Sequence, residues 1–148
     1  MVLGVVGGEG GGRCVHCVLG PASDPRNVAK EALIHHSGKV IQIKQNITCT
    51  SSGCLYLLSC TKNTCRKQYI GESGRPLYKR FKEHKDSAQT PDTTCPVGQH
   101  FQLPGHSVRD MEMLPVEVVR GDLATRKVRE RDLINTNQMI RFGMNVRL

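Results

Sequence analysis

Two short apolar runs separated by a polar turn form the clearest pattern in the chain. Residues 54–58 are continuously apolar, which is typical of a buried strand. Residues 61–64 have the composition of a turn, and residues 68–71 read as a second strand. The pattern therefore predicts a β-hairpin that carries one tyrosine in each strand, Tyr56 and Tyr69.

A helix is expected directly after this hairpin. Pro76 suits the first turn of a helix, where no backbone donor is needed. Leu77, Phe81 and Lys85 then recur at a spacing of four residues and mark one line of the helix. Residues 86–96 are polar and are expected to form a loop.

The C-terminal third of the chain predicts one more strand and one more long helix. Residues 111–119 alternate as a strand, and Pro115 favours a position at the sheet edge. Asp122 is a suitable N-cap for a basic amphipathic helix over residues 123–136, and residues 143–145 close a final turn. The fold class is therefore α+β, with a small antiparallel three-stranded β-sheet flanked by helices.

The N-terminal third shows much weaker patterning. Residues 1–13 are rich in glycine and too poor in apolar periodicity to order themselves. Residues 14–47 read as a linker or cysteine knuckle, with a short helical pattern over 27–35 and a short strand over 40–43. We therefore expect a flexible N-terminal segment over residues 1–47 and a folded domain over residues 48–148.

Charge and cysteine content narrow the function classes. The net charge of +8 over 148 residues favours an anionic partner such as nucleic acid, against the alternative of a merely soluble basic protein. Seven cysteines without a visible secretion signal indicate reduced thiols in an intracellular protein, some of them binding metal. A nuclear location is expected. No apolar stretch approaches the roughly 20 residues of a membrane span, so no membrane association is expected.

Four side chains have the chemistry of a structural zinc site. Cys60 and Cys65 lie at the tip of the predicted hairpin, and His100 and His106 follow at short spacing. Two thiolates and two imidazoles make a tetrahedral Zn²⁺ ligand set. The alternative is a pair of unrelated thiols beside two surface histidines.

A second group of residues has the chemistry of phosphodiester hydrolysis. Arg80 and His84 are four residues apart, so a helix places them on one face. Glu130 is either a carboxylate that holds Mg²⁺ or the salt-bridge partner of Arg126, four residues before it. Taken alone, Tyr56 and Tyr69 could equally be tyrosines of the strand core.

The ordered set of these residues resembles the GIY-YIG nuclease superfamily over about residues 54–146. The first family motif is degenerate, because Cys54-Leu55-Tyr56 lacks the initial glycine, whereas Tyr69-Ile70-Gly71 is intact. The resemblance implies a metal-dependent DNA endonuclease. The matching site residues are Tyr56, Tyr69, Arg80, His84, Glu130 and Asn145.

The resemblance also implies a role for each matching position. Either tyrosine helps to deprotonate the attacking water, and Arg80 stabilises the pentavalent phosphate. His84 orients a tyrosine or relays a proton. Glu130 binds Mg²⁺ (or Mn²⁺), and Asn145 buttresses the site.

The cysteine pair between the two tyrosine motifs makes the resemblance narrower. Together with the later His-Phe-Gln-Leu-Pro-Gly-His run, residues 100–106, it is similar to the endonuclease of Penelope-like retroelements. In those elements the nuclease nicks target DNA to prime reverse transcription. The resemblance therefore implies a zinc-binding insertion in this chain. It also implies a reverse transcriptase domain as a partner, which this chain lacks. The alternatives are a structure-specific DNA repair nuclease of the same family and a nuclease-inactive, zinc-stabilised nucleic-acid-binding relic.

A second zinc site and a DNA-binding surface complete the expectations. Cys14 and Cys17 resemble a cysteine knuckle, to be completed by Cys49 or Cys54 with His35 or His36. Two basic clusters flank the proposed site and would neutralise DNA phosphates without reading bases. The residues expected to bind DNA are Lys67, Arg75, Lys79, Lys82, Arg126 and Arg129.

Overall fold

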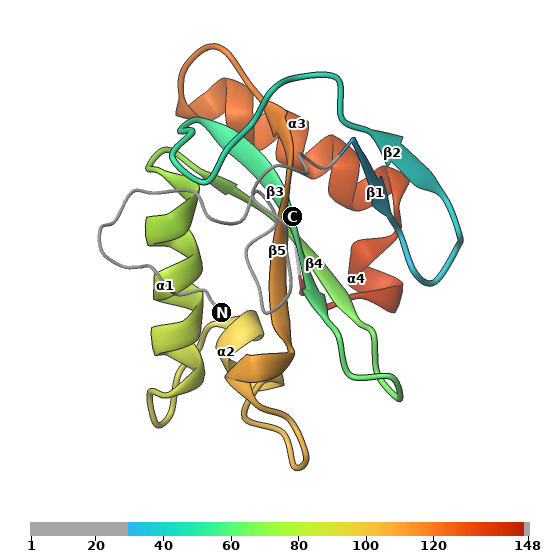
Figure 1. The fold of residues 1–148 in the computed structure, drawn as a ribbon, viewed down its shortest axis with the longest axis vertical. Helices are drawn as coiled ribbons and strands as arrows, with labels where there is room; N and C mark the ends of the chain where they lie inside the picture. Colours follow the sequence, from blue (N-terminus) through green and yellow to red (C-terminus); the bar gives the residue numbers. More distant parts are fainter. Residues whose placement is uncertain (1–29, 147–148) are drawn as a thin grey trace.

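A three-stranded antiparallel sheet forms the centre of the computed structural model, which describes residues 30–146 (Figure 1). The strand order is β4-β3-β5, with β3 (Cys54–Cys60) between β4 (Gln68–Ser73) and β5 (Met111–Val118). Every residue of β3 is buried, which explains the continuous apolar run over residues 54–58. The predicted hairpin, and the edge position of the strand that contains Pro115, are confirmed.

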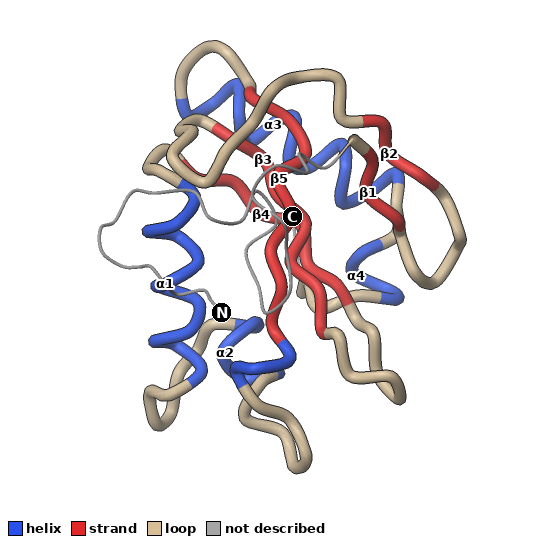
Figure 2. Tube along the Cα trace, viewed as in Figure 1, coloured by secondary structure: helices blue, strands red, loops and turns tan. Residues whose placement is uncertain are grey.

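Helices cover both sides of this sheet, as the α+β prediction requires (Figures 1 and 2). α1 lies on one side, and α3 and α4 lie on the other with a small hairpin of β1 and β2. The helical elements are α1 (Leu77–Ala88), α2 (Pro96–His100), the 3-10 helix η2 (Val108–Asp110), α3 (Leu123–Thr136) and α4 (Met139–Phe142). No helix within residues 30–146 is long and apolar enough to cross a membrane.

The two long helices follow their sequence signals closely. Pro76 is the N-cap of α1, and Asp122 caps α3 by accepting a 3.0 Å hydrogen bond from the amide of Thr125. The loop expected from residue 86 begins only after Ala88, because α1 continues far enough to bury that residue. The short helices α2 and α4 were not predicted, since four or five residues show no helical period.

The prediction of a helix over residues 27–35 is wrong for residues 30–35, the part of this stretch that the structure describes. Glu31–Leu33 forms strand β1, which pairs antiparallel with β2 (Val40–Gln42). The buried side-chain amide of Gln68 fixes this extended backbone: it donates to the carbonyl of Leu33 at 2.9 Å and accepts from the amide of His35 at 2.9 Å. These long-range bonds override a weak local helical pattern.

Residues 30–47, expected to belong to a flexible segment, are packed on the sheet. Ala32, Ile34, Ile43 and Ile47 are buried in the same apolar cluster as the strands. His36 adds a 2.8 Å hydrogen bond to the carbonyl of Asn137. This part of the chain therefore contributes to the core that carries the site.

Candidate active site and metal centre

The register of β3 and β4 places both motif tyrosines on one face of the sheet. Tyr56 lies opposite Gly71, and Tyr69 lies opposite Leu58. A Cβ atom on Gly71 would overlap the Tyr56 hydroxyl and approach Tyr69 Cε1 to 2.9 Å. Glycine is therefore required at position 71, because the tyrosine rings fill the space that any other side chain would need.

Tyr56 is the centre of a buried hydrogen-bonded network beneath α1. Its hydroxyl lies 2.6 Å from Nε2 of His84 and receives a 3.1 Å hydrogen bond from Nε of Arg80. Burial, assisted by the Arg80 charge, lowers the pKa of His84 to about 3, so the imidazole is neutral. Arg80 can only donate, so the Tyr56 hydroxyl accepts from Arg80 and shares a further hydrogen bond with His84.

Burial also decides the ionisation of the two tyrosines. Tyr56 is 0% exposed, and desolvation raises its pKa well above the ordinary value although Arg80 opposes the shift. Burial raises the pKa of Tyr69 as well. Arg80 stays charged and is held by a second contact, a 2.9 Å ion pair with Glu83.

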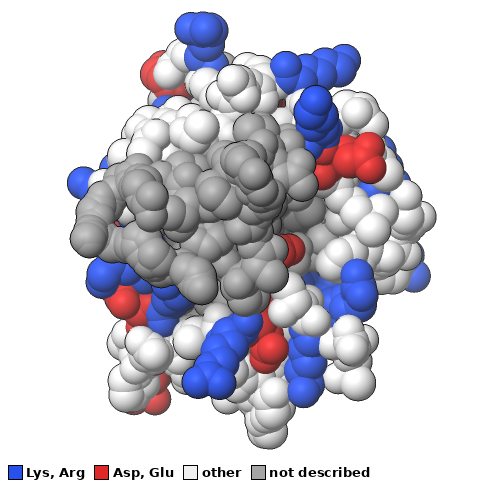
Figure 3. Space-filling view, viewed as in Figure 1, with Lys and Arg blue, Asp and Glu red and all other residues white. Residues whose placement is uncertain are grey.

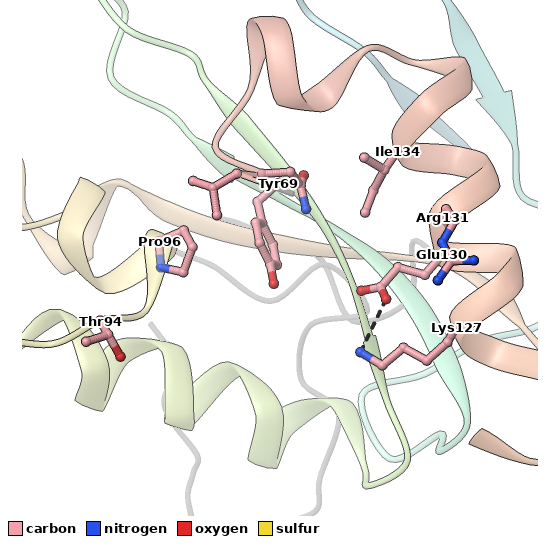
Figure 4. A pocket seen from close by; sticks show the side chains of 9 residues that line it. Tyr69, Thr94, Pro96, Lys127, Glu130, Arg131 and Ile134 are labelled. Atoms are coloured by element: carbon pink, nitrogen blue, oxygen red, sulfur yellow. Dashed lines mark hydrogen bonds and ion pairs between the residues drawn. The ribbon is translucent and has the colours of Figure 1, made fainter. Parts of the chain in front are cut away.

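Tyr69 borders a cavity of about 390 Å³ beside β4 and α3 (Figure 4). Glu130 lies in the same cavity, and burial raises the pKa of its carboxyl group despite the nearby Lys127. The cavity is lined by Tyr69, Thr94, Pro96, Lys127, Glu130, Arg131, Ile134, Asn145 and Val146. Tyr56 is not among these residues, so the two tyrosines occupy different environments.

Asn145 connects the C-terminal turn to the strand that carries Tyr69. Its side-chain oxygen accepts from the amide of Ile70 at 2.9 Å, and its side-chain nitrogen donates to the carbonyl of Ile70 at 3.0 Å. Asn145 is 6% exposed, and the pair of bonds occupies the outer edge of β4. Its place in the site is therefore to hold β4 in position.

Cys60, Cys65, His100 and His106 converge as a group that could hold a metal such as zinc. One ligand atom from each lies within 4.8 Å of all the others. Nε2 of His106 is buried and has no hydrogen-bond partner, while Nδ1 lies 3.2 Å from the carbonyl of Pro104. An imidazole that is oriented by a carbonyl and has its other nitrogen free fits a zinc ligand.

The group ties two distant parts of the chain together. Cys60 ends β3 and Cys65 lies in the turn before β4, whereas His100 ends α2 and His106 precedes η2. Thr94 and Pro96, which form one wall of the cavity, lie just before these histidines. A metal ion here would therefore fix both the tyrosine hairpin and the cavity wall.

The second zinc site stays a prediction, because two of its expected ligands lie outside the described residues. Cys14 and Cys17 lie outside them, and Cys49 is buried in the apolar core. Within residues 30–146, the Cys60 group is the only cluster of three or more metal-binding side chains close enough to share an ion. His35 and His36 bind the carbonyls of Arg66 and Asn137, respectively.

Most residues expected to bind DNA are held in ion pairs within the protein. Lys82 pairs with Asp86 at 2.8 Å, and Arg129 pairs with Glu117 at 2.9 Å. Arg126 pairs with Glu72 at 3.0 Å with only 14% of its side chain exposed, and Arg75 pairs with Glu83. Lys67 and Lys79 are exposed. Figure 3 shows Lys and Arg spread around the described part of one face, interleaved with acidic side chains.

Sequence reasoning did not identify Lys127 and Glu72 as site residues. Lys127 lines the cavity, and its Nζ lies 3.4 Å from a Glu130 oxygen and 3.3 Å from a Glu72 oxygen. The available signals were the position of Glu72, directly after the Tyr-Ile-Gly motif, and the spacing of three residues between Lys127 and Glu130. Neither signal distinguishes a site residue from a surface charge.

Comparison of the chain with protein-family models, with curated proteins and with solved structures finds no match.

Proposed function

We propose that this protein is a metal-dependent DNA endonuclease of the GIY-YIG type. The observation that carries the proposal is spatial. Tyr69 and Glu130 line one cavity, and the hydrogen-bonded group of Tyr56, Arg80 and His84 lies directly beside it. The Tyr69 ring is 6.4 Å from the Tyr56 ring and 5.8 Å from the His84 ring, between centroids. A phenol, a guanidinium, a neutral imidazole and a carboxylate supply the proton-transfer and charge-stabilising groups of phosphodiester hydrolysis.

The environments of the tyrosines assign them different tasks. Tyr69 borders the cavity, so its hydroxyl is the group that contacts the attacking water. Tyr56 is a positioning residue, because its hydroxyl orients both Arg80 and His84. Arg80 places its charge beside the phosphate. The neutral His84 orients the Tyr56 hydroxyl.

Glu130 is the residue that would hold a divalent ion such as Mg²⁺ or Mn²⁺. Its carboxylate fits such an ion, because it borders a cavity with room for water and phosphate ligands, and it is largely desolvated. When bound, the ion would supply positive charge to the reacting phosphate. A zinc ion at Cys60, Cys65, His100 and His106 would be structural.

Within this family we place the chain nearest to the Penelope-like endonucleases. The support is the Cys60–Cys65 pair between the tyrosine motifs, which meets His100 and His106 in the fold. In that setting the enzyme nicks nuclear target DNA and a reverse transcriptase domain extends from the nick. Cleavage restricted to flaps or junctions would instead assign the chain to the structure-specific repair nucleases.

The test is nicking of supercoiled plasmid in Mg²⁺ by the full chain. Glu130→Ala is expected to reduce nicking at least about a hundredfold, because the divalent ion loses its carboxylate, while DNA affinity persists. Glu117→Ala is the matched control, since this glutamate lies on β5 outside the cavity. Equal cleavage by Glu130→Ala and wild type would overturn the proposal.

A nucleic-acid-binding protein without nuclease activity is the second candidate. The degenerate first motif favours it, because Cys54 stands where the nuclease family begins with glycine. DNA binding that weakens with salt, with no cleavage in Mg²⁺ or Mn²⁺, would establish this alternative.

A further inference from the structure

The ammonium group of Lys127 lies between two carboxylates at the edge of the cavity. Its Nζ is 3.4 Å from Oε1 of Glu130 and 3.3 Å from Oε2 of Glu72. Both glutamate side chains are 13% exposed, whereas Lys127 is 51% exposed. Figure 4 shows the lysine reaching from α3 to the Glu130 carboxylate. One half-exposed cation thus contacts two largely desolvated carboxylates.

The two carboxylates differ in how well they are satisfied. Glu72 also accepts a 3.0 Å bond from Nε of Arg126, whose side chain is 14% exposed. Glu130 has no cation other than Lys127 among its ion pairs within residues 30–146. Because a desolvated carboxylate without a counter-ion is costly, Glu130 needs either Lys127 or another cation.

Resting on the proposed function, in which Glu130 binds a divalent ion, we propose that Lys127 is a built-in competitor of that ion. When the ion binds Glu130, the ammonium is transferred fully to Glu72. The transfer is small, since Glu72 is already in contact with Nζ. Lys127 therefore weakens metal binding, and Glu72 strengthens it by holding the released ammonium.

This arrangement differs from a general field of positive charge in one respect. In a general field, removing Lys127 and removing the charge of Glu72 change metal affinity independently. In the proposed exchange of Lys127 between the two carboxylates, loss of the Glu72 charge strengthens the ion pair of Lys127 with Glu130. Removing the lysine then has a larger effect in the Glu72 variant than in wild type.

The experiment measures Mn²⁺ binding to the zinc-loaded full chain by electron paramagnetic resonance, with Glu130→Gln as the baseline. Lys127→Met is expected to tighten Mn²⁺ binding about threefold, the range of one half-exposed ion pair. Glu72→Gln is expected to weaken it by a similar factor. Lys127→Met added to Glu72→Gln is expected to tighten it by clearly more than threefold.

Arg131→Met is the matched control, because it removes the same charge from the lining of the same cavity. A tightening by Lys127→Met no larger than that of Arg131→Met, or equal effects of Lys127→Met in both backgrounds, would overturn the exchange. Equal Mn²⁺ affinity of wild type and Glu130→Gln would instead overturn the metal assignment in the proposed function. The two failures are therefore distinguishable.

Discussion

The α1 side and the α3 side of the site are built from opposite kinds of interaction. On the α1 side, Tyr56 and His84 are buried and joined by a 2.6 Å hydrogen bond in which both partners are neutral. On the α3 side, Lys127 makes contacts of 3.3 and 3.4 Å to two charged groups and remains half-exposed. Short hydrogen bonds between buried groups hold one arrangement, whereas long, half-exposed ion pairs readily exchange partners.

This difference matches the tasks that we propose for the two sides. Positioning Arg80 beside a phosphate requires a fixed geometry, which the buried network supplies. Accepting a divalent ion requires a carboxylate whose resident cation can leave. The comparison therefore predicts that substitutions on the α1 side cost stability, whereas those on the α3 side change binding.

Metal removal should have the largest effect and should separate the two sides. Chelation is expected to lower the free energy of unfolding by at least about 3 kcal/mol, a drop in Tm on the order of 10 °C, because folding and metal binding are coupled. Amide hydrogen exchange should rise over residues 94–106, which include one wall of the cavity and both histidines of the metal group, and much less in α1. Cys65→Ser should reproduce this and Cys95→Ser, at an exposed cysteine outside the cluster, should not. An unchanged Tm after chelation would contradict a structural metal.

Gly71→Ala tests the packing of the α1 side. The new methyl group would overlap the Tyr56 hydroxyl and crowd the Tyr69 ring, so we expect a loss of about 2–3 kcal/mol. Chemical denaturation would measure it. Gly74→Ala is the control, since its Cβ meets only the flexible guanidinium end of Arg126. Equal stability of both variants would show that the tyrosines are not tightly packed.

The two tyrosine-to-phenylalanine changes compare a buried hydroxyl with one that faces the cavity. Tyr56→Phe removes the hydroxyl that Nε2 of His84 and Nε of Arg80 share in the interior and should cost about 1–2 kcal/mol. Tyr69→Phe should cost under about 0.5 kcal/mol, yet reduce nicking strongly. Thermal unfolding and plasmid nicking measured on both variants would decide this. Reversed stability losses would exchange the roles of the tyrosines.

Local pattern was sufficient for the three sheet strands, for the two long helices and for part of the site. Continuous apolarity identified β3, and the Asp122 cap identified the start of α3. The spacing of Arg80 and His84 was enough to place both on one face of α1, since helical geometry relates residues four apart. The pairing of Cys60 and Cys65 with His100 and His106 followed from ligand chemistry.

What the sequence by itself determined is therefore the order of the three sheet strands and the two long helices, and the residue types that the site contains. Only the tertiary structure decided that residues 30–47 join the core, that Tyr56 is buried while Tyr69 faces the cavity, and that Lys127 lies between Glu72 and Glu130. The physical reason is separation along the chain. The Asn145 clamp on Ile70 spans 75 positions, and the His36 bond to Asn137 spans 101. Such contacts depend on how the elements pack, and no local period encodes that packing.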